Sequence, residues 1–571
     1  MRDPLSIRGL LRILPSCALA FGLDAGLHAA EPAPSSMTQV LEAAIANERD
    51  LAATLESHRP VVEAYLQTVK PDPVMGVVPV RDNYFFGRLE LTSGTEGGKP
   101  AKVSKKKTIS LLEDFHSAVF KPEDFSRMLI LDRGSFDRTT YEFHFLRSEF
   151  LGDVRAFVFD VTPKEGKPLD RYRPGRFTGR IWVEDQGYHI VRYNGIYASS
   201  LAANFHFDSW RMNVASGTWL PAYVYTEEGD KTSRQLNLSY RGQIRVWGYQ
   251  LEQPNAEDEF TKVMLETAGA RDEGDAPGQS SPVESARQWQ LEAEENVVRR
   301  LEGAGLIAPR GKLDAILETV VNNLEVTNGI EMDPPVHCRV LLTTPLESFT
   351  VGRTIVISRG LIDVLPDEAS LAVILAHELG HVMSGHELDT RYAFTDRVLI
   401  GDREAVRQFQ FGRTPAEEAE ADAKAVSLLR NSPYKDKLAN AGLFLKALDA
   451  GAPSMRALIR PHFGDGQLYR MTAIVDAAPE LDPASMQQIA ALPLGGRVRV
   501  DPWTARVELL PANRVALVSA REKMPFQVTP LMPYLSRLDG KAEPAPATAA
   551  ATVPDGVAAS AGVHDSSDLR P

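Results

Sequence analysis

Two histidines and a glutamate with the spacing of a metal-binding motif lie in the second half of the chain. His377, Glu378 and His381 form the pattern His-Glu-x-x-His within residues 366–382. Apolar residues at helical spacing surround the motif, and Asp367 is placed to cap a helix. Residues four apart project from one helix face, so both imidazoles could bind one zinc ion. Glu378 could then accept a proton from water at the metal.

The alternative is a core helix with two buried histidines and no metal, which the rarity of the motif disfavours. A catalytic zinc needs a third protein ligand and an open fourth position. The metzincin pattern is excluded, because Ser384 and Glu387 stand where it requires glycine and histidine. The third ligand must therefore come from another part of the chain, and a downstream glutamate is the remaining option.

The acidic run 414–422 offers three glutamates. Thr414 and Glu417 form a capping box, which predicts a helix starting here and places Glu417 at its entrance. Glu420 falls on a polar face, where Lys424 is four residues away. Glu418 shares its face with small and apolar residues that pack inward, and a buried carboxylate needs a partner. We therefore predict Glu418 as the third ligand.

Two further acidic residues belong to this hypothesis. Glu404 is a weaker rival for the third ligand, because its neighbours suggest a polar surface. Asp422, one turn beyond Glu418, could accept a hydrogen bond from a ligating imidazole and fix its tautomer. Its alternative interpretation is an ordinary aspartate on a helix surface.

Together these motifs resemble those of the HtpX-type and CAAX-prenyl-protease-type zinc metallopeptidases. Members of this family are gluzincins whose third ligand lies in a Glu-x-x-Ala-Asp motif. Residues 418–422 match it in each fixed position, and His386 follows His381 as in the family's common continuation. The resemblance extends over about residues 313–470. It implies an enzyme with one Zn²⁺ ion that hydrolyses peptide bonds in protein or peptide substrates.

The resemblance implies further roles. Residues 348–362 look like the family strand that lines the cleft, which makes Arg353, Thr354, Ile355 and Val356 candidate substrate-binding residues. A substrate segment would pair with this strand by β-augmentation. Relatives carry His-Pro and then Arg after the third ligand. The nearest match here is Pro461-His462 followed by Arg470, with the dipeptide in reverse order. The resemblance therefore makes His462 a candidate catalytic residue and Arg470 a candidate support.

Composition restricts the partners and the location. The chain has 571 residues and a formal net charge of −13, which argues against nucleic acid as a partner. Residues 1–30 resemble a secretory signal peptide, which predicts a periplasmic or secreted protein with no transmembrane span after processing. Lipidation at Cys17 is a less favoured alternative. Most familiar relatives are integral membrane proteins, whereas this chain resembles their soluble periplasmic branch. Cys338 is expected to be a small buried apolar residue.

Patterning predicts an α+β fold with several units. A helical segment is expected over 31–80 and an antiparallel β-rich domain over 81–254, with a faint likeness to lipoprotein-carrier half-barrels. A linker over 255–281 precedes a mainly helical, zincin-type peptidase domain with a small sheet over 282–538. A disordered tail is expected over 539–571.

The β-rich domain leaves a second function open. It is large and holds no evident catalytic cluster. The chain could therefore be an envelope chaperone or assembly factor with latent proteolytic activity, binding a lipoprotein or an outer-membrane protein. The first hypothesis is a zinc metalloendopeptidase of envelope protein quality control. Sequence alone does not separate the two, because a sheet with one buried face can serve either.

Overall fold

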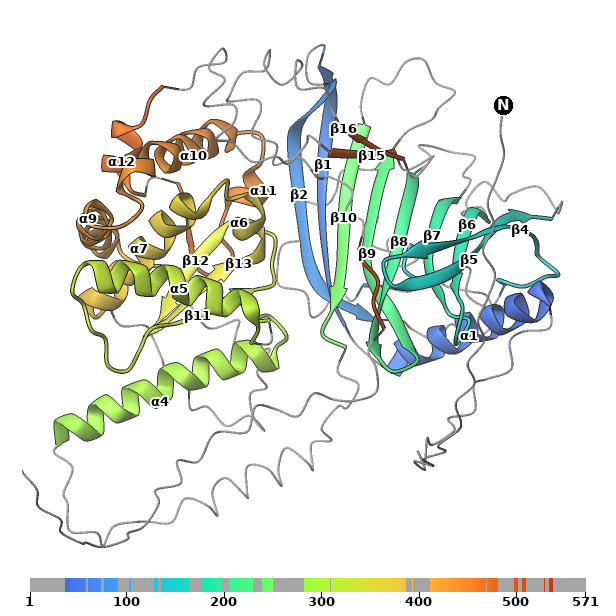
Figure 1. The fold of residues 1–571 in the computed structure, drawn as a ribbon, viewed down its shortest axis with the longest axis horizontal. Helices are drawn as coiled ribbons and strands as arrows, with labels where there is room; N and C mark the ends of the chain where they lie inside the picture. Colours follow the sequence, from blue (N-terminus) through green and yellow to red (C-terminus); the bar gives the residue numbers. More distant parts are fainter. Residues whose placement is uncertain are drawn as a thin grey trace, which may run out of the picture.

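A computed structural model shows a large antiparallel sheet beside a mainly helical unit (Figure 1). This confirms the predicted α+β class. The structure describes residues 36–57, 60–72, 76–90, 102–103, 128–131, 135–164, 176–197, 205–228, 239–249, 282–308, 310–386, 393, 411–468, 470–480, 498–501, 506–509, 528 and 533–537. The expected signal peptide, linker and tail, and also Cys17 and Glu404, lie outside these residues.

The large sheet has ten strands in the order β3-β2-β1-β10-β9-β8-β7-β6-β5-β4. Each strand pairs antiparallel with its neighbours. The strands are β1 (Val61–Asp72), β2 (Gly76–Glu90), β3 (Lys102–Val103), β4 (Tyr141–Leu151), β5 (Val154–Pro163), β6 (Phe177–Glu184), β7 (Ile190–Tyr197), β8 (Phe205–Ala215), β9 (Thr218–Glu228) and β10 (Ser239–Trp247).

Helix α1 (Met37–Ser57) packs against one face of this sheet, near β6 and β7 (Figure 1). Its Val40, Leu41 and Ala44 enter a core with aromatic residues of the strands, among them Phe177 and Phe207. The sheet therefore buries one face under a helix, as an antiparallel sheet with an apolar face requires.

The prediction of a helical segment through residue 80 is wrong beyond Ser57. β1 begins at Val61 and runs to Asp72, where it pairs with both β2 and β10. The segment starts with Val61 and Val62 and has Tyr65 and Val69 further on, residue types that favour strands. β10, from residues 239–247, pairs antiparallel with this segment. A partner far along the chain therefore determines that the segment is a strand and not a helix.

The helical unit is built around a second, four-stranded sheet in the order β11-β13-β12-β14. None of the helices in the described ranges is long and apolar enough to cross a membrane. The elements of the helical unit are α4 (Pro282–Gly303), α5 (Lys312–Thr327), β11 (His337–Leu341), β12 (Glu347–Val351), β13 (Thr354–Ser358), α6 (Arg359–Val364), α7 (Glu368–Ser384), α9 (Pro415–Arg430), η2 (Lys435–Lys437), α10 (Leu438–Gly451), α11 (Arg456–Ile459), β14 (Asp465–Gly466) and α12 (Thr472–Ala477). A separate two-stranded sheet joins β15 (Val498–Asp501) to β16 (Arg506–Leu509).

Buried polar contacts join the two units where β1 and β2 face the helical part. The Glu63 carboxylate accepts hydrogen bonds from the Thr344 backbone N–H at 2.6 Å and its hydroxyl at 2.8 Å. Asp82 accepts from the backbone N–H groups of Ala457 and Leu458 at 2.9 and 2.8 Å. Both carboxylates are buried. Because an unpaired buried carboxylate is costly, these contacts fix how the units meet.

Helices α7 and α9 approach each other closely where both carry small residues. A Cβ atom at Gly380 would lie 2.6 Å from the Ala421 carbonyl oxygen, which no real side chain tolerates. Ala421 is itself fully buried. Glycine is therefore required at position 380 to let the two helix backbones come together.

This contact predicts that Gly380→Val destabilises the fold. The added side chain must push α9 away, so the free energy of unfolding should fall by about 1–3 kcal/mol in urea denaturation. Ala423→Val is the control, because Ala423 is on the exposed face of α9 and its branched side chain costs only helix propensity. Equal losses in both variants would contradict the tight contact.

Candidate metal centre

His377 and His381 project from the buried middle of α7 toward a common point. Asp367 caps this helix by accepting a hydrogen bond from the Ser370 backbone N–H, and Gly385 ends it in a left-handed conformation. Both imidazoles are 1% exposed, and their Nε2 atoms are 3.1 Å apart. The helix and the spacing that the sequence predicted are therefore both present.

Glu418 brings a carboxylate to the same point from α9. Its Oε2 lies 3.3 Å from His377 Nε2, and its Oε1 lies 3.4 Å from His381 Nε2. Thr414 and Glu417 form the predicted capping box at the start of α9, which sets the rotation of this helix. Glu420 stays at the exposed side, 3.4 Å from Lys424. Among the described residues, His377, His381 and Glu418 are the group that could hold a metal ion.

Each histidine has a partner behind it that fixes its tautomer. Asp422 Oδ1 lies 2.7 Å from His377 Nδ1, so that nitrogen carries the proton and Nε2 keeps a lone pair. His381 Nδ1 lies 2.8 Å from His386 Nδ1, and His386 Nε2 faces Glu420 at 3.5 Å. With His386 donating to Glu420, its Nδ1 accepts from His381, whose Nε2 is then also a free acceptor.

Three acceptor atoms thus converge with their lone pairs facing one another, an arrangement that a cation satisfies. Ligands at about 2.0–2.1 Å from a tetrahedral zinc lie about 3.3 Å from one another. The two Nε2 atoms are 3.1 Å apart, and each lies 3.3 or 3.4 Å from a different oxygen of Glu418, so the three groups are close enough to share one ion. Two imidazoles and one carboxylate are the donor set of a catalytic zinc site with an open fourth position. The residues therefore fit a single divalent ion.

Glu378 lies beside this group and is held rigidly. Its Oε1 accepts hydrogen bonds from the Ser348 hydroxyl at 2.6 Å and from Arg470 Nη1 at 3.1 Å. The side chain is 1% exposed. Ser348 belongs to β12, so the strand next to the metal helix orients the carboxylate. A carboxylate held in this way can receive and return a proton at a defined position.

Arg470 links the acidic groups of the site. It donates to both oxygens of Glu418, at 3.0 and 3.3 Å, besides its bond to Glu378, and it lies 3.6 Å from Asp465. The sequence suggested only a supporting role, whereas the structure puts Arg470 in contact with two central residues. Arg413 also acts on Glu378, Glu418 and Asp465, and Asp422 adds a fourth carboxylate beside His377, so the four acidic groups outnumber the two arginines. This surplus of negative charge favours a bound cation.

The pKa values of the site reflect the same surplus. Burial raises the pKa of Asp465 to about 6, and the nearby charges of Glu418 and Glu378 add to this while Arg470 opposes it. Burial and Arg470 act to lower the pKa of His377, but Asp422 and Glu418 outweigh them and raise it. Burial would raise the pKa of Glu418, yet its contacts with both histidines and Arg470 hold it below its usual range.

The strand predicted to bind substrate, Arg353 to Val356, is in the wrong place for that role. β13 (Thr354–Ser358) pairs along its length with β11 on one side and β12 on the other. It has no free edge for an added strand, so this prediction is corrected. The Arg353 guanidinium instead donates to the Pro334 carbonyl at 2.7 Å.

β12 is the strand with an open edge beside the metal group. Outside β13 it pairs only with β14, at Glu347 and Ser348, among the described residues. The outer edge of Phe349 to Val351 is therefore the place where β-augmentation could occur. In the structure Arg413 covers this edge: it donates to the Thr350 hydroxyl at 2.9 Å and to the Thr350 carbonyl at 3.4 Å, and Phe349 to Val351 are buried. A substrate strand would therefore have to replace the arginine there.

His462 lies apart from the metal group. Its ring stacks on Tyr84 of β2, with ring centroids 4.9 Å apart, and its backbone N–H donates to Glu347 at 2.9 Å. No contact between this side chain and His377, Glu378, His381 or Glu418 occurs within the described residues. Its catalytic role stays a prediction that the geometry does not support.

Sequence reasoning assigned no roles to Ser348, His386 and Gln467. Gln467 donates to the Ser348 hydroxyl at 2.9 Å, which completes the support of Glu378. His386 could have been recognised, because Gly385 allows the chain to turn back at the end of α7. Ser348 and Gln467 carried no signal, since their partners are 30 or more residues away. Cys338 is buried as expected, and burial raises the pKa of its thiol.

The paired histidines on one helix and the glutamate from the next form a group that could hold a metal ion. Residues 311–400 match the family described as Peptidase family M48, which confirms the resemblance inferred from the motifs. The chain thus carries an M48-type metallopeptidase domain. The match includes His377, Glu378 and His381, while Glu418, Asp422 and Arg470 follow it. No curated protein matches the chain.

Support from Asp422 predicts a measurable effect on metal affinity. Asp422→Asn should weaken binding of Zn²⁺ by about 10- to 100-fold, because the amide no longer stabilises the protonated Nδ1 of His377. Competition against a chromophoric chelator measures this without any turnover. Asp449→Asn, on the exposed side of α10, is the control and should bind Zn²⁺ like the unaltered protein. Unchanged affinity in Asp422→Asn would refute the supporting role.

Proposed function

We propose that this chain is a zinc-dependent metalloendopeptidase that cleaves unfolded or misassembled proteins of the cell envelope. The observation that carries the proposal is the convergence of His377, His381 and Glu418, with Glu378 held beside them. A nitrogen and oxygen ligand set with an open position suits zinc among the common divalent ions. A zinc ion held there would supply Lewis acidity toward a carbonyl group.

The residues of the chain account for the remaining chemistry. Glu378 takes a proton from the attacking water and later returns it to the leaving amine. Ser348 and Arg470 fix its Oε1, so the carboxylate cannot rotate away from the ion. A peptide that pairs with the open edge of β12 would lie beside Glu378. Backbone pairing recognises many sequences, which suits an endopeptidase acting on unfolded chains.

The location is part of the proposal. Residues 1–30 have the features of a secretory signal peptide, and the chain carries no more than one cysteine after them. We infer a periplasmic or secreted protein whose substrates are envelope proteins. Fusion of residues 1–40 to a reporter that is active only after export would measure this.

Replacement of Glu378 by glutamine separates metal binding from proton transfer. Glu378→Gln should keep its zinc content and lose cleavage of an unfolded test protein by about 100-fold or more, because glutamine cannot accept the proton. Metal analysis and gel-based cleavage assays measure the two properties. Glu295→Gln, on the exposed side of α4, serves as the control and should stay active. Full cleavage by Glu378→Gln would end the proposal.

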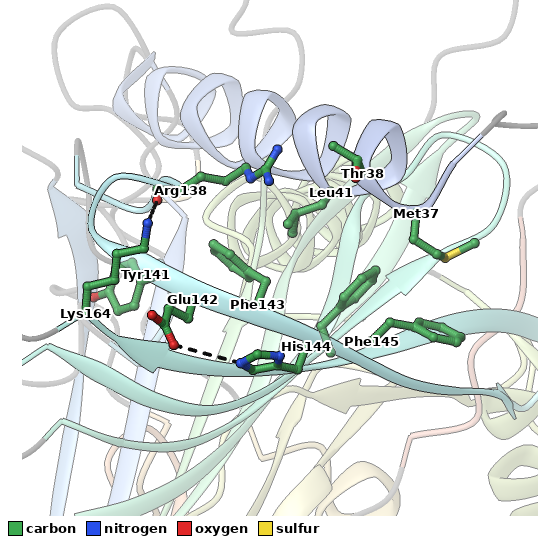
Figure 2. Close-up of a pocket in the computed structure, with 11 residues that line it drawn as sticks. Met37, Thr38, Leu41, Arg138, Tyr141, Glu142, Phe143, His144, Phe145 and Lys164 are labelled. Carbon is green, nitrogen blue, oxygen red and sulfur yellow. Dashed lines mark hydrogen bonds and ion pairs between the residues drawn. The ribbon is translucent and has the colours of Figure 1, made fainter.

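A groove between α1 and β4 supports the second candidate function, an envelope chaperone or assembly factor. It encloses about 430 Å³. Figure 2 shows Phe143 pointing from β4 toward α1, and Glu142, His144 and Phe145 of the same strand also line the groove. Met37 and Leu41 line it from the helix. Arg138 and Lys164 also line it, so the lining suits an amphiphilic occupant, such as an acylated segment of a lipoprotein whose acyl chain contacts the aromatic rings, or an apolar segment of an outer-membrane protein with acidic residues beside it.

The groove predicts binding of an amphiphilic probe by the full chain. Phe145→Asp should weaken binding of a dansyl-labelled fatty acid by about tenfold or more, because it places a charge in the apolar lining. Phe150→Asp is the control on the same strand, since Phe150 is 70% exposed and outside the groove, against 45% for Phe145. Equal binding by both variants would argue against a carrier role.

A further inference from the structure

A cavity of about 900 Å³ lies between the large sheet and the peptidase unit. Residues 80–84 of β2 form one wall, and residues 452–468 contribute the other. The cavity is distinct from the groove under α1 and from the metal ligands, none of which lines it. Because both units contribute walls, it exists only where the sheet is docked on the peptidase.

The cavity is cationic, although the protein is acidic. Arg81, Arg456 and Arg460 line it, and Asp82 is its one acidic residue. Asp82 uses both oxygens to accept from backbone N–H groups, so it does not neutralise the arginines. The three guanidinium groups have no ion-pair partner within the described ranges and are on exposed residues. On a chain with a net charge of −13, such a concentration of positive charge favours an anionic ligand.

His462 adds an unused acceptor to the same cavity. Its ring donates to the Ala457 carbonyl, while its buried Nε2 has no partner. The donating nitrogen is therefore Nδ1, and Nε2 keeps a lone pair. Burial and the charge of Arg460 lower the pKa of His462 to about 4, so the ring is neutral at pH 7. The ring therefore adds no positive charge to the cavity, and the arginines alone supply it.

Two residues, Gln467 and Ser348, link the cavity to the catalytic carboxylate. Gly466 and Leu468 line the cavity, and Gln467 between them donates to the Ser348 hydroxyl that holds Glu378. Gly466 also pairs with Glu347 at the start of β12. The cavity therefore borders the short strand that pairs with β12 and the side chain that supports the catalytic carboxylate.

We propose that this cavity is a recognition site for acidic segments of the polypeptide substrate, whose carboxylates pair with Arg81, Arg456 and Arg460. The bound segment lies beside the cleaved bond and increases the affinity for chains with clustered aspartate or glutamate. This proposal rests on the proposed peptidase function. Backbone pairing with β12 does not distinguish one substrate sequence from another. The cavity adds a preference for acidic segments.

Peptide binding to the inactive Glu378→Gln protein tests the site without turnover. A fluorescein-labelled peptide with four glutamates should bind, and adding Arg456→Gln with Arg460→Gln should weaken binding by about tenfold, as expected for lost charge-assisted hydrogen bonds. Arg81→Gln tests the opposite wall and should also weaken binding. Arg430→Gln, an exposed arginine at the end of α9, is the matched control. Versions with free and amidated C-termini distinguish side-chain carboxylates from a terminal carboxylate.

Several outcomes would overturn the proposal. Equal binding of the matching glutamine peptide, an equal loss with Arg430→Gln, or no loss with the cavity variants would each do so. In the active protein, the cavity variants should raise KM for acidic substrates and leave kcat unchanged. Cleavage without this KM effect rejects the cavity and keeps the peptidase. Arginine-dependent binding without cleavage of any peptide rejects the peptidase and keeps a site for acidic peptides.

Discussion

The close approach of α7 and α9 is the constraint on which the active centre depends. Gly380 lies between the two histidines of α7, and the absence of its side chain lets the Ala421 backbone come near. Glu418 precedes Ala421 by three residues and Asp422 follows it directly. Glu418 therefore contacts Nε2 of His377, and Asp422 contacts Nδ1. One contact between small residues thus sets the distance of the metal ligand and of the hydrogen-bond acceptor behind it.

Electrostatics explains why this arrangement needs a cation. Glu378, Glu418 and Asp465 surround Arg470, and all are at least partly buried. Buried carboxylates without compensation are costly, and Arg470 together with the nearby Arg413 does not offset these three and Asp422. A divalent ion at the two imidazoles would compensate the remaining negative charge. The site is therefore built to be stable with its metal, and folding and metal binding should be coupled.

Local sequence was sufficient for the parts of the site that lie on single helices. The spacing of His377 and His381, the capping box at Thr414 and the inward face of Glu418 all follow from helical periodicity. The prediction of a helical segment over residues 31–80 was wrong beyond Ser57, because pairing with β10 makes the segment from Val61 a strand. The substrate strand failed for a related reason: the order of strands in a sheet is not written in any one of them. β14, only two residues long, makes β12 rather than β13 the strand with an open edge.

The large sheet contributes to the peptidase more than a neighbouring surface. Glu63 holds Thr344, just before β12, and Glu347 at the start of β12 accepts from the backbone N–H groups of His462, Phe463 and Gly464. Asp82 holds the start of α11 a few residues earlier. These buried carboxylates fix both ends of the segment that supports Ser348 and Glu378. Because the N–H groups of Thr344, Ala457 and Leu458 would lose their acceptors if the sheet separated, the docked sheet is part of what holds the catalytic carboxylate in place.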